Sequence, residues 1–189
     1  LHYPLRRQRQ MCIRDRFNDI VNTNGLTRFV GYTDDTVSTT VGSILVNGAL
    51  AETVSAPADV EIVLADTPFY AEMGGQLADQ GTISLAGGGI IEVDDVQAPV
   101  KGLSVHRGRL IEGTARTGES AIARIDTERR GAIARAHTAT HMVHQALREE
   151  LGEGATQAGS ENSPGRMRFD FRYGQAVPQS SLAQVEGKV

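Results

Sequence analysis

One long amphipathic stretch, residues 126–151, constrains the fold of this chain more than any other feature. At about 100° per residue its apolar side chains fall on one stripe, and polar or charged side chains lie opposite. Asp126 stands where an N-cap is expected, and Gly152 follows the last apolar residue, where a C-cap glycine is common. The pattern therefore predicts a single helix. Its apolar stripe consists of Ile133, Ala136, Thr140, Val143, Leu147 and Leu151.

Three histidines line one flank of that stripe. His137 and His141 are four residues apart, so on a helix their rings point the same way and can bind one metal ion. A pair at this spacing can also arise by chance among five histidines, so metal binding and plain packing both stay open. His144 lies closest to the middle of the stripe, and we expect it to pack or to support a ligand. A zincin protease is excluded, because Thr138 stands where such enzymes carry their glutamate.

Composition and charge exclude several further classes. The chain is 40% apolar and 22% charged, which is ordinary for a globular protein of 189 residues. No run approaches 18 consecutive apolar residues, so we expect no membrane span. One cysteine, Cys12, excludes an internal disulfide framework and favours a reducing compartment, here the cytoplasm.

The net charge of −4 argues against a broad surface that coats nucleic acid. Local basic patches can still contact RNA, and a solvated face is the equally open alternative. The arginines concerned are Arg124, Arg129, Arg130, Arg135, Arg166, Arg168 and Arg172.

Residues 1–16 are dense in arginine and lack periodicity, so we expect a non-native tail and exclude them from the fold. Residues 17–113 show a hydrophobic period of two in short runs, including 37–41, 60–64 and 82–93. Glycines at 87–89 predict a hairpin within the last of these runs. Many short strands of this kind predict a small antiparallel β-barrel.

After the long helix, residues 167–172 alternate between apolar and charged side chains, which predicts a strand. A second amphipathic helix is expected from Pro178 onward. The predicted fold class is thus α+β, with residues 17–113 as the barrel and residues 114–189 as a second domain.

Residues 68–76 form a turn-rich segment that ends in Gly74, Gly75 and Gln76. Adjacent glycines permit close approach of the backbone to a partner. Gly-Gly-Gln also occurs in peptide release factors, but three residues are too few to carry that identity. A tight turn at a barrel rim, with Gln76 capping backbone groups, and a functional loop therefore remain open.

These segments, in this order, resemble the editing region of the alanyl-tRNA synthetase family. The resemblance extends over residues 17–189, and the ordered set is specific although no single motif is. The segments are residues 28–32, residues 66–76, Arg129 and Arg130 with the run 137–141, residues 157–160, and residues 168–171.

The resemblance implies a β-barrel followed by a two-layer α/β editing core of the threonyl- and alanyl-tRNA synthetase type, truncated at its C-terminus. It implies hydrolysis of tRNA for alanine that carries serine or glycine by mistake. His137 and His141 correspond to two of four Zn²⁺ ligands, and the family's remaining Cys-x-x-x-His pair is not in this sequence. Thr140 would recognise the serine hydroxyl and Gln157 would shape the same pocket. ATP, which the ligase reaction uses, would bind outside these residues.

A separate editing site is needed because a pocket that binds alanine cannot strongly reject serine, which adds a hydroxyl, or the smaller glycine. Zinc would position the aminoacyl group and polarise either the ester or a water, and the residues leave that choice open. With two of four ligands present, we expect weak zinc binding and little hydrolysis by this chain alone.

Two alternatives remain. A stand-alone trans-editing hydrolase would use the same chemistry, although residues 17–32 resemble the joint with the synthetase's tRNA-recognition domain. A non-enzymatic RNA-binding barrel would bind RNA without a metal ion. The sequence leaves the oligomeric state open.

Overall fold

The computed structural model describes residues 3–189, with side chains from Arg14 onward. The chain divides into two compact units, one of Leu1–Glu72 with Ala78–Asp126 and one of Met73–Leu77 with Thr127–Val189. The α+β class is confirmed. The side chain of Cys12 lies outside the described residues. No described helix is both long and apolar enough to cross a membrane.

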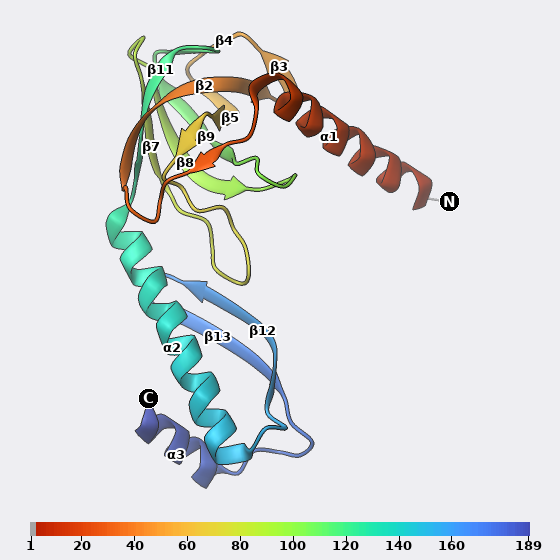
Figure 1. The fold of residues 1–189 in the computed structure, drawn as a ribbon, viewed down its shortest axis with the longest axis vertical. Coiled ribbons are helices and arrows are strands. Elements are labelled where there is room, and N and C mark those ends of the chain that lie inside the picture. Colours follow the sequence, from red (N-terminus) through yellow and green to blue (C-terminus); the bar gives the residue numbers. More distant parts are fainter. Residues whose placement is uncertain (1–2) are drawn as a thin grey trace. The chain divides into compact units, whose positions relative to one another are not determined.

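The first unit is a closed antiparallel barrel, and its strands can be followed in Figure 1. In the described part of the chain, strands pair in the order β11-β7-β8-β9-β5-β2, and β11 also pairs with β2, which closes the barrel. The small barrel expected from the period-two runs is therefore present. The strands are β2 (Thr36–Val46), β5 (Ala58–Leu64), β7 (Gly81–Leu85), β8 (Ile90–Gln97), β9 (Val105–Glu112) and β11 (Ser120–Ile125).

Shorter strands extend this framework. β3 (Ala49–Ala51) pairs with the end of β2, and β4 (Thr53–Ser55) pairs with β10 (Thr114–Arg116). β1 (Arg28–Phe29) lies parallel to β6 (Asp66–Thr67). The hairpin predicted for residues 82–93 is confirmed, and Gly88 takes the positive φ of its turn.

The barrel core follows directly from the alternation of side chains along the strands. Phe69, which follows β6, is its largest member, and five further large aliphatic members come from five different strands that each turn one face to the same interior. Ile44, Ile62, Ile83, Ile91 and Leu110 are all essentially fully buried there.

Helix α1 (Tyr3–Asn24) covers part of the barrel's outer face. Phe17 and Ile20, one helical turn apart, pack with the outward-facing Leu45 and Val63 in a second apolar cluster. The barrel was expected to begin at Phe17, whereas helix α1 continues to Asn24. The helix persists because it buries this apolar side against β2 and β5.

The first unit also extends past the boundary expected at Gly113, to Asp126. The reason is pairing: β11 joins β7 on one side and β2 on the other, so the barrel is complete only with residues 120–125. The alternation of apolar and polar side chains at residues 121–125 is typical of a strand but carries no information about the strand's partners.

The second unit contains α2 (Thr127–Leu151), the hairpin of β12 (Thr156–Ser163) and β13 (Arg166–Arg172), and α3 (Gln179–Lys188). Figure 1 shows the hairpin alongside α2. The long helix, the strand at 167–172 and the helix after Pro178 are confirmed. Gly152 has φ 83° and donates its N–H to the Arg148 carbonyl, as a C-cap does.

A separate small core holds this unit together. Leu147 and Ala146 of α2 and Val185 of α3 are buried in it, with Phe169 and Phe171 of β13 packed against them. The ring of His144 lies 5.1 Å from that of Phe169, which fits the packing role expected for this histidine.

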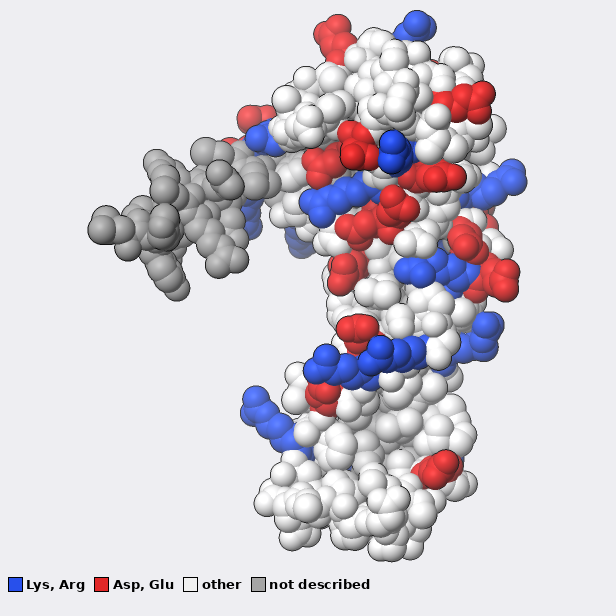
Figure 2. Space-filling view, turned by 180° about the vertical axis from the view of Figure 1, so that it is seen from behind, with Lys and Arg blue, Asp and Glu red and all other residues white. Residues whose placement is uncertain are grey.

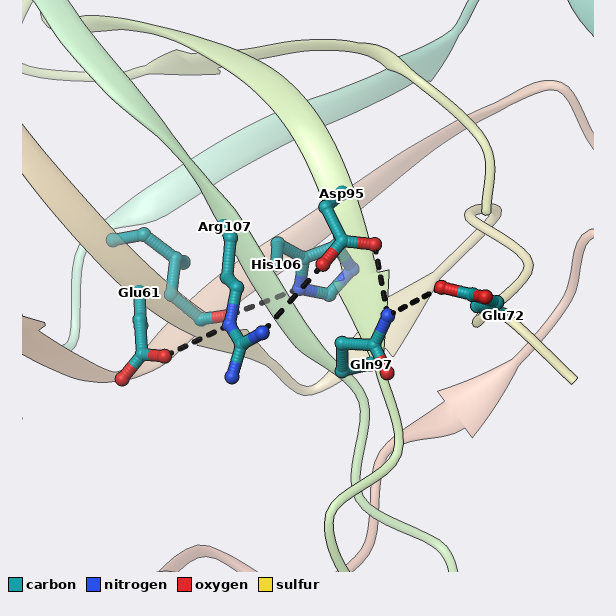
Figure 3. Close-up of polar contacts among 7 residues, drawn as sticks. Glu61, Glu72, Asp95, Gln97, His106 and Arg107 are labelled. Atoms are coloured by element: carbon teal, nitrogen blue, oxygen red, sulfur yellow. Dashed lines mark hydrogen bonds and ion pairs between the residues drawn. The ribbon is translucent and has the colours of Figure 1, made fainter. Parts of the chain in front are cut away.

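One polar side chain, His106, is completely enclosed in the barrel (Figure 3). Its Nδ1–H donates to the Ile62 carbonyl at 2.9 Å, and its Nε2 accepts the Thr67 hydroxyl at 2.7 Å. The rings of Phe69 and His106 form a T-shaped pair with their centroids 5.3 Å apart. Both nitrogens of the neutral ring are thus satisfied, and burial lowers the pKa of His106 to about 4.

The next residue, Arg107, points outward and lies between Glu61 at 2.9 Å and Asp95 at 3.6 Å (Figure 3). Gln97 extends this surface network from Asp95 to Glu72. Because these groups are partly exposed, each ion pair contributes little to stability.

We predict that the barrel loses stability as the pH falls from about 6.5 to about 4. In this range the unfolded chain binds a proton at position 106 and the folded chain does not, so protonation favours unfolding, by about 3 kcal/mol at pH 4. Urea unfolding followed by NMR signals of the barrel strands measures this loss. His106→Gln should be less stable at neutral pH yet show a smaller loss on acidification, and an equal loss in both proteins would contradict the assignment.

Candidate functional site

The candidate site lies within the second unit, on one flank of α2. The rings of His137 and His141 stack with their centroids 4.9 Å apart and their planes 24° apart. His137 is half-buried and His141 is exposed. The two rings therefore point the same way from adjacent turns of the helix, as their spacing predicted, and one side of the pair is open to solvent.

The loop Met73–Leu77 is the second component of the site. Although it follows strand β6 of the first unit in sequence, it belongs to the second unit. The carbonyl of Gly75 accepts the N–H of Asn162 at 2.7 Å, and the N–H of Leu77 donates to the Asn162 carbonyl at 3.3 Å. The loop thus lies along β12 like a short parallel strand, with Gln76 opposite Asn162.

Gly75 explains why the loop can approach β12 so closely. Its φ is +83°, and a Cβ atom placed on it would lie 2.3 Å from the Ser160 carbonyl oxygen. At Gly74, with φ +63°, a Cβ atom would meet nothing within 4 Å. Only one of the two glycines is therefore required by a close contact.

Gln76 connects the loop to the histidine pair. Its Oε1 accepts a hydrogen bond from Nδ1 of His137 at 3.0 Å. From the sequence alone, both a turn-capping role and a functional role were open for Gln76. The structure directs its side chain to a predicted zinc ligand.

Thr140 lies in the buried interior of the site. Its side chain is 4% exposed, and its hydroxyl lies 2.6 Å from Oδ1 of Asn162 and 3.0 Å from the Ala136 carbonyl. A hydroxyl has one hydrogen and two acceptor lone pairs, so donation to Asn162 leaves it able to accept a further hydrogen bond.

Gln157 lies at the edge of this group. It is exposed on β12, beside a bulge between Gln157 and Gly159, and its Nε2 donates to the Ser160 hydroxyl at 3.2 Å. Ser160 is also the residue against which Gly75 packs. Gln157 therefore reaches the loop through Ser160, and the roles predicted for Thr140 and Gln157 stay predictions.

Asn162 is a residue of the site that the sequence did not indicate. It is 2% exposed, bonds the loop through its backbone and bonds Thr140 through its side chain. Nothing in the pattern of β12 distinguishes it, because its importance comes from partners far away in the chain.

The donor set fits part of a zinc site. Two neutral imidazoles on one helical face are typical zinc ligands, and a structural or catalytic site needs three or four in total. Among the described residues, no group of three or more His, Cys, Asp or Glu side chains is arranged to hold a metal ion. The residues present can thus supply two ligands, His137 and His141.

On the face that Figure 2 shows, basic and acidic side chains are interspersed over much of the surface. In the second unit, Arg168 pairs with Asp170 at 2.8 Å. Arg135 and Arg166 line a shallow groove of about 300 Å³ beside Ala136 and Ala139. RNA contact by these arginines stays a prediction.

Comparison with known proteins identifies similar chains. The sequence model of the tRNA synthetases class II (A) matches residues 5–129. The alanine–tRNA ligase of Thermobifida fusca is 44% identical over an alignment that covers 100% of this chain. The alanine–tRNA ligases of Acidothermus cellulolyticus and Bifidobacterium longum are each 55% identical over 85% of it.

The chain spans only a small part of these curated relatives, namely 22%, 18% and 18% of their lengths. The class II match begins at residue 5, inside residues 1–16. The expectation of a non-native tail there stays a prediction.

We predict that Thr140→Val destabilises the second unit by about 1–3 kcal/mol. The change leaves the buried Oδ1 of Asn162 without its hydroxyl partner. Thr138→Val is the matched control, because Thr138 is exposed on the same helix, and it should change stability by less than about 0.5 kcal/mol. Urea unfolding followed by NMR signals of α2 makes the comparison, and equal effects would contradict the role of the buried bond.

We also predict that Gly75→Ala is more damaging than Gly74→Ala. Both substitutions carry the strain of a positive φ, but only the first forces the loop away from the Ser160 carbonyl. Losing the two backbone bonds to Asn162 should cost about 2 kcal/mol more in unfolding free energy. Hydrogen exchange of the Asn162 amide reports the displacement directly, and similar exchange in both variants would argue against loop docking.

Proposed function

The chain belongs to the alanyl-tRNA synthetase family of the class II (A) tRNA synthetases, and on that premise we propose that it is part of an alanine–tRNA ligase whose second unit serves zinc-dependent editing. In this proposal the whole enzyme attaches alanine to its tRNA with ATP, which binds outside these residues. The editing site removes serine or glycine that has been attached to the tRNA for alanine. The reaction takes place in the cytoplasm.

The observation that carries the proposal is the histidine pair. Parallel rings on adjacent turns, one of them hydrogen-bonded through Nδ1 to Gln76, are suited to hold one metal ion through the nitrogens left over. Bound zinc would supply a Lewis acid that orients the aminoacyl group and polarises the ester or a water. The other two ligands of the proposed site come from outside these residues.

The surrounding residues prepare the site for its substrate. The Thr140–Asn162 bond braces α2 against β12, beside His141. Because the Thr140 oxygen can still accept a hydrogen bond, it is suited to meet the hydroxyl of a misattached serine. Gln157, held by Ser160, would border the same pocket.

Editing by such a site would supply discrimination that an alanine pocket cannot. A hydrophobic pocket rejects an isostere with an extra hydroxyl only weakly, whereas a site built to hydrogen-bond that hydroxyl selects it strongly. A buried threonine next to a zinc ligand is consistent with the second kind of site.

The test uses the chain extended downstream until a Cys-x-x-x-His pair is included. We expect this protein to bind one zinc ion and to hydrolyse seryl-tRNA for alanine. His137→Ala should lose most of the zinc and slow hydrolysis by more than about 100-fold, because even indirect partners of a metal ligand are worth 10–100-fold. Zinc content by mass spectrometry and deacylation of labelled tRNA measure the two effects.

His144→Gln is the matched control, since His144 is on the same helix but packs against Phe169. It should retain its zinc. Full hydrolysis by a zinc-free protein would overturn the metal assignment. Binding of tRNA without hydrolysis, unaffected by chelators or by His141→Ala, would instead support the non-enzymatic RNA-binding module.

A further inference from the structure

We infer that Gln76 is a positioning residue that determines which ring nitrogen of His137 carries the proton. The hydrogen bond between Gln76 Oε1 and His137 Nδ1 leaves Nε2 as the free nitrogen of the ring. That Nε2 binds a metal ion rests on the proposed function, whereas the position of the ring proton does not.

The chemistry of the two groups sets the direction of this bond. An amide oxygen only accepts hydrogen bonds, so Nδ1 at 3.0 Å must donate. A neutral imidazole has one N–H and one lone pair, and therefore Nε2 holds the lone pair. Metal-binding histidines commonly donate their second nitrogen to an oxygen in this way, which fixes both the tautomer and the ring orientation.

The glutamine is itself held in place. The backbone groups of Gln76 and Met73 exchange two hydrogen bonds across the turn, at 3.1 and 3.3 Å. On either side of Gln76, Gly75 and Leu77 bond the backbone of Asn162. The side chain therefore extends from a backbone that is already ordered, which lowers the entropic cost of directing its oxygen at His137.

The effect extends to the second histidine. Because the rings of His137 and His141 stack at 4.9 Å, a fixed orientation of the first limits the orientations open to the second. One neutral amide thus orders a pair of imidazoles without adding a charge. A residue 61 positions away along the chain supplies this control.

The first experiment measures the tautomer directly in this chain, free of metal and at alkaline pH. Long-range ¹H–¹⁵N correlation spectra of labelled histidine distinguish protonated from unprotonated ring nitrogens. We expect His137 to carry its proton mainly on Nδ1. A proton mainly on Nε2 would overturn the inference, whatever the variants show.

Gln76→Leu removes the acceptor and keeps a side chain of similar size. We expect the Nδ1–H form of His137 to fall from the major to the minor species. Gln76→Glu keeps an acceptor and should keep the proton on Nδ1. Gln145→Leu is the matched control on α2, since Gln145 is exposed and bonds Glu149, and it should leave the His137 tautomer unchanged.

Backbone spectra of each variant show whether the second unit remains folded, and the tautomer of the unsubstituted chain decides the inference if Gln76→Leu does not fold. An unchanged tautomer in a folded Gln76→Leu protein would contradict the role of the glutamine.

The consequence for metal binding is measured separately, in the extended protein, by competition with a chromophoric chelator. Gln76→Leu should weaken zinc binding by about 10–100-fold, and Gln76→Glu should not. If the extended protein binds no zinc or hydrolyses no seryl-tRNA, the proposed function fails while the tautomer result still stands. If zinc binding and hydrolysis are intact but the proton is on Nε2, the role of Gln76 fails alone.

Discussion

Two backbone hydrogen bonds, from Asn162 to Gly75 and from Leu77 to Asn162, are the interaction on which the candidate site depends. They attach the loop Met73–Leu77 to β12 and so bring Gln76 to His137. The contact is possible only because position 75 has no side chain, since any Cβ atom there would collide with the Ser160 carbonyl. Without this attachment the histidine pair would still project from α2, but nothing in the loop would orient it.

Asn162 converts that backbone contact into a buried polar network. Its side chain accepts the Thr140 hydroxyl, so one residue joins the loop, the hairpin and the helix. Groups this deeply buried are costly when unpaired and rigid when paired. The barrel follows the same rule at His106, whose two nitrogens are both satisfied. The ion pairs around Arg107 are partly exposed and therefore add little rigidity.

Membership of the alanyl-tRNA synthetase family does not by itself assign roles to individual residues. Here the geometry separates the candidates. His137, Gln76 and Thr140 are tied into one hydrogen-bonded arrangement through the loop and Asn162. Gln157 is exposed and joins it only through Ser160. Gln76 and Asn162 thus belong to the candidate site together with the residues that the sequence had already indicated.

Local pattern determined the elements of this protein, because helical and strand periodicities are properties of neighbouring residues. Residues 126–151, the hairpin at 82–93 and the parallel direction of His137 and His141 all follow from spacing alone. Tertiary structure decided what spacing cannot encode. The closure of the barrel by β11, the burial of Phe17 and Ile20 of α1 against the barrel, and the bond from Gln76 to His137 all join residues far apart in the chain. Such contacts depend on how whole elements pack, and no local period records them.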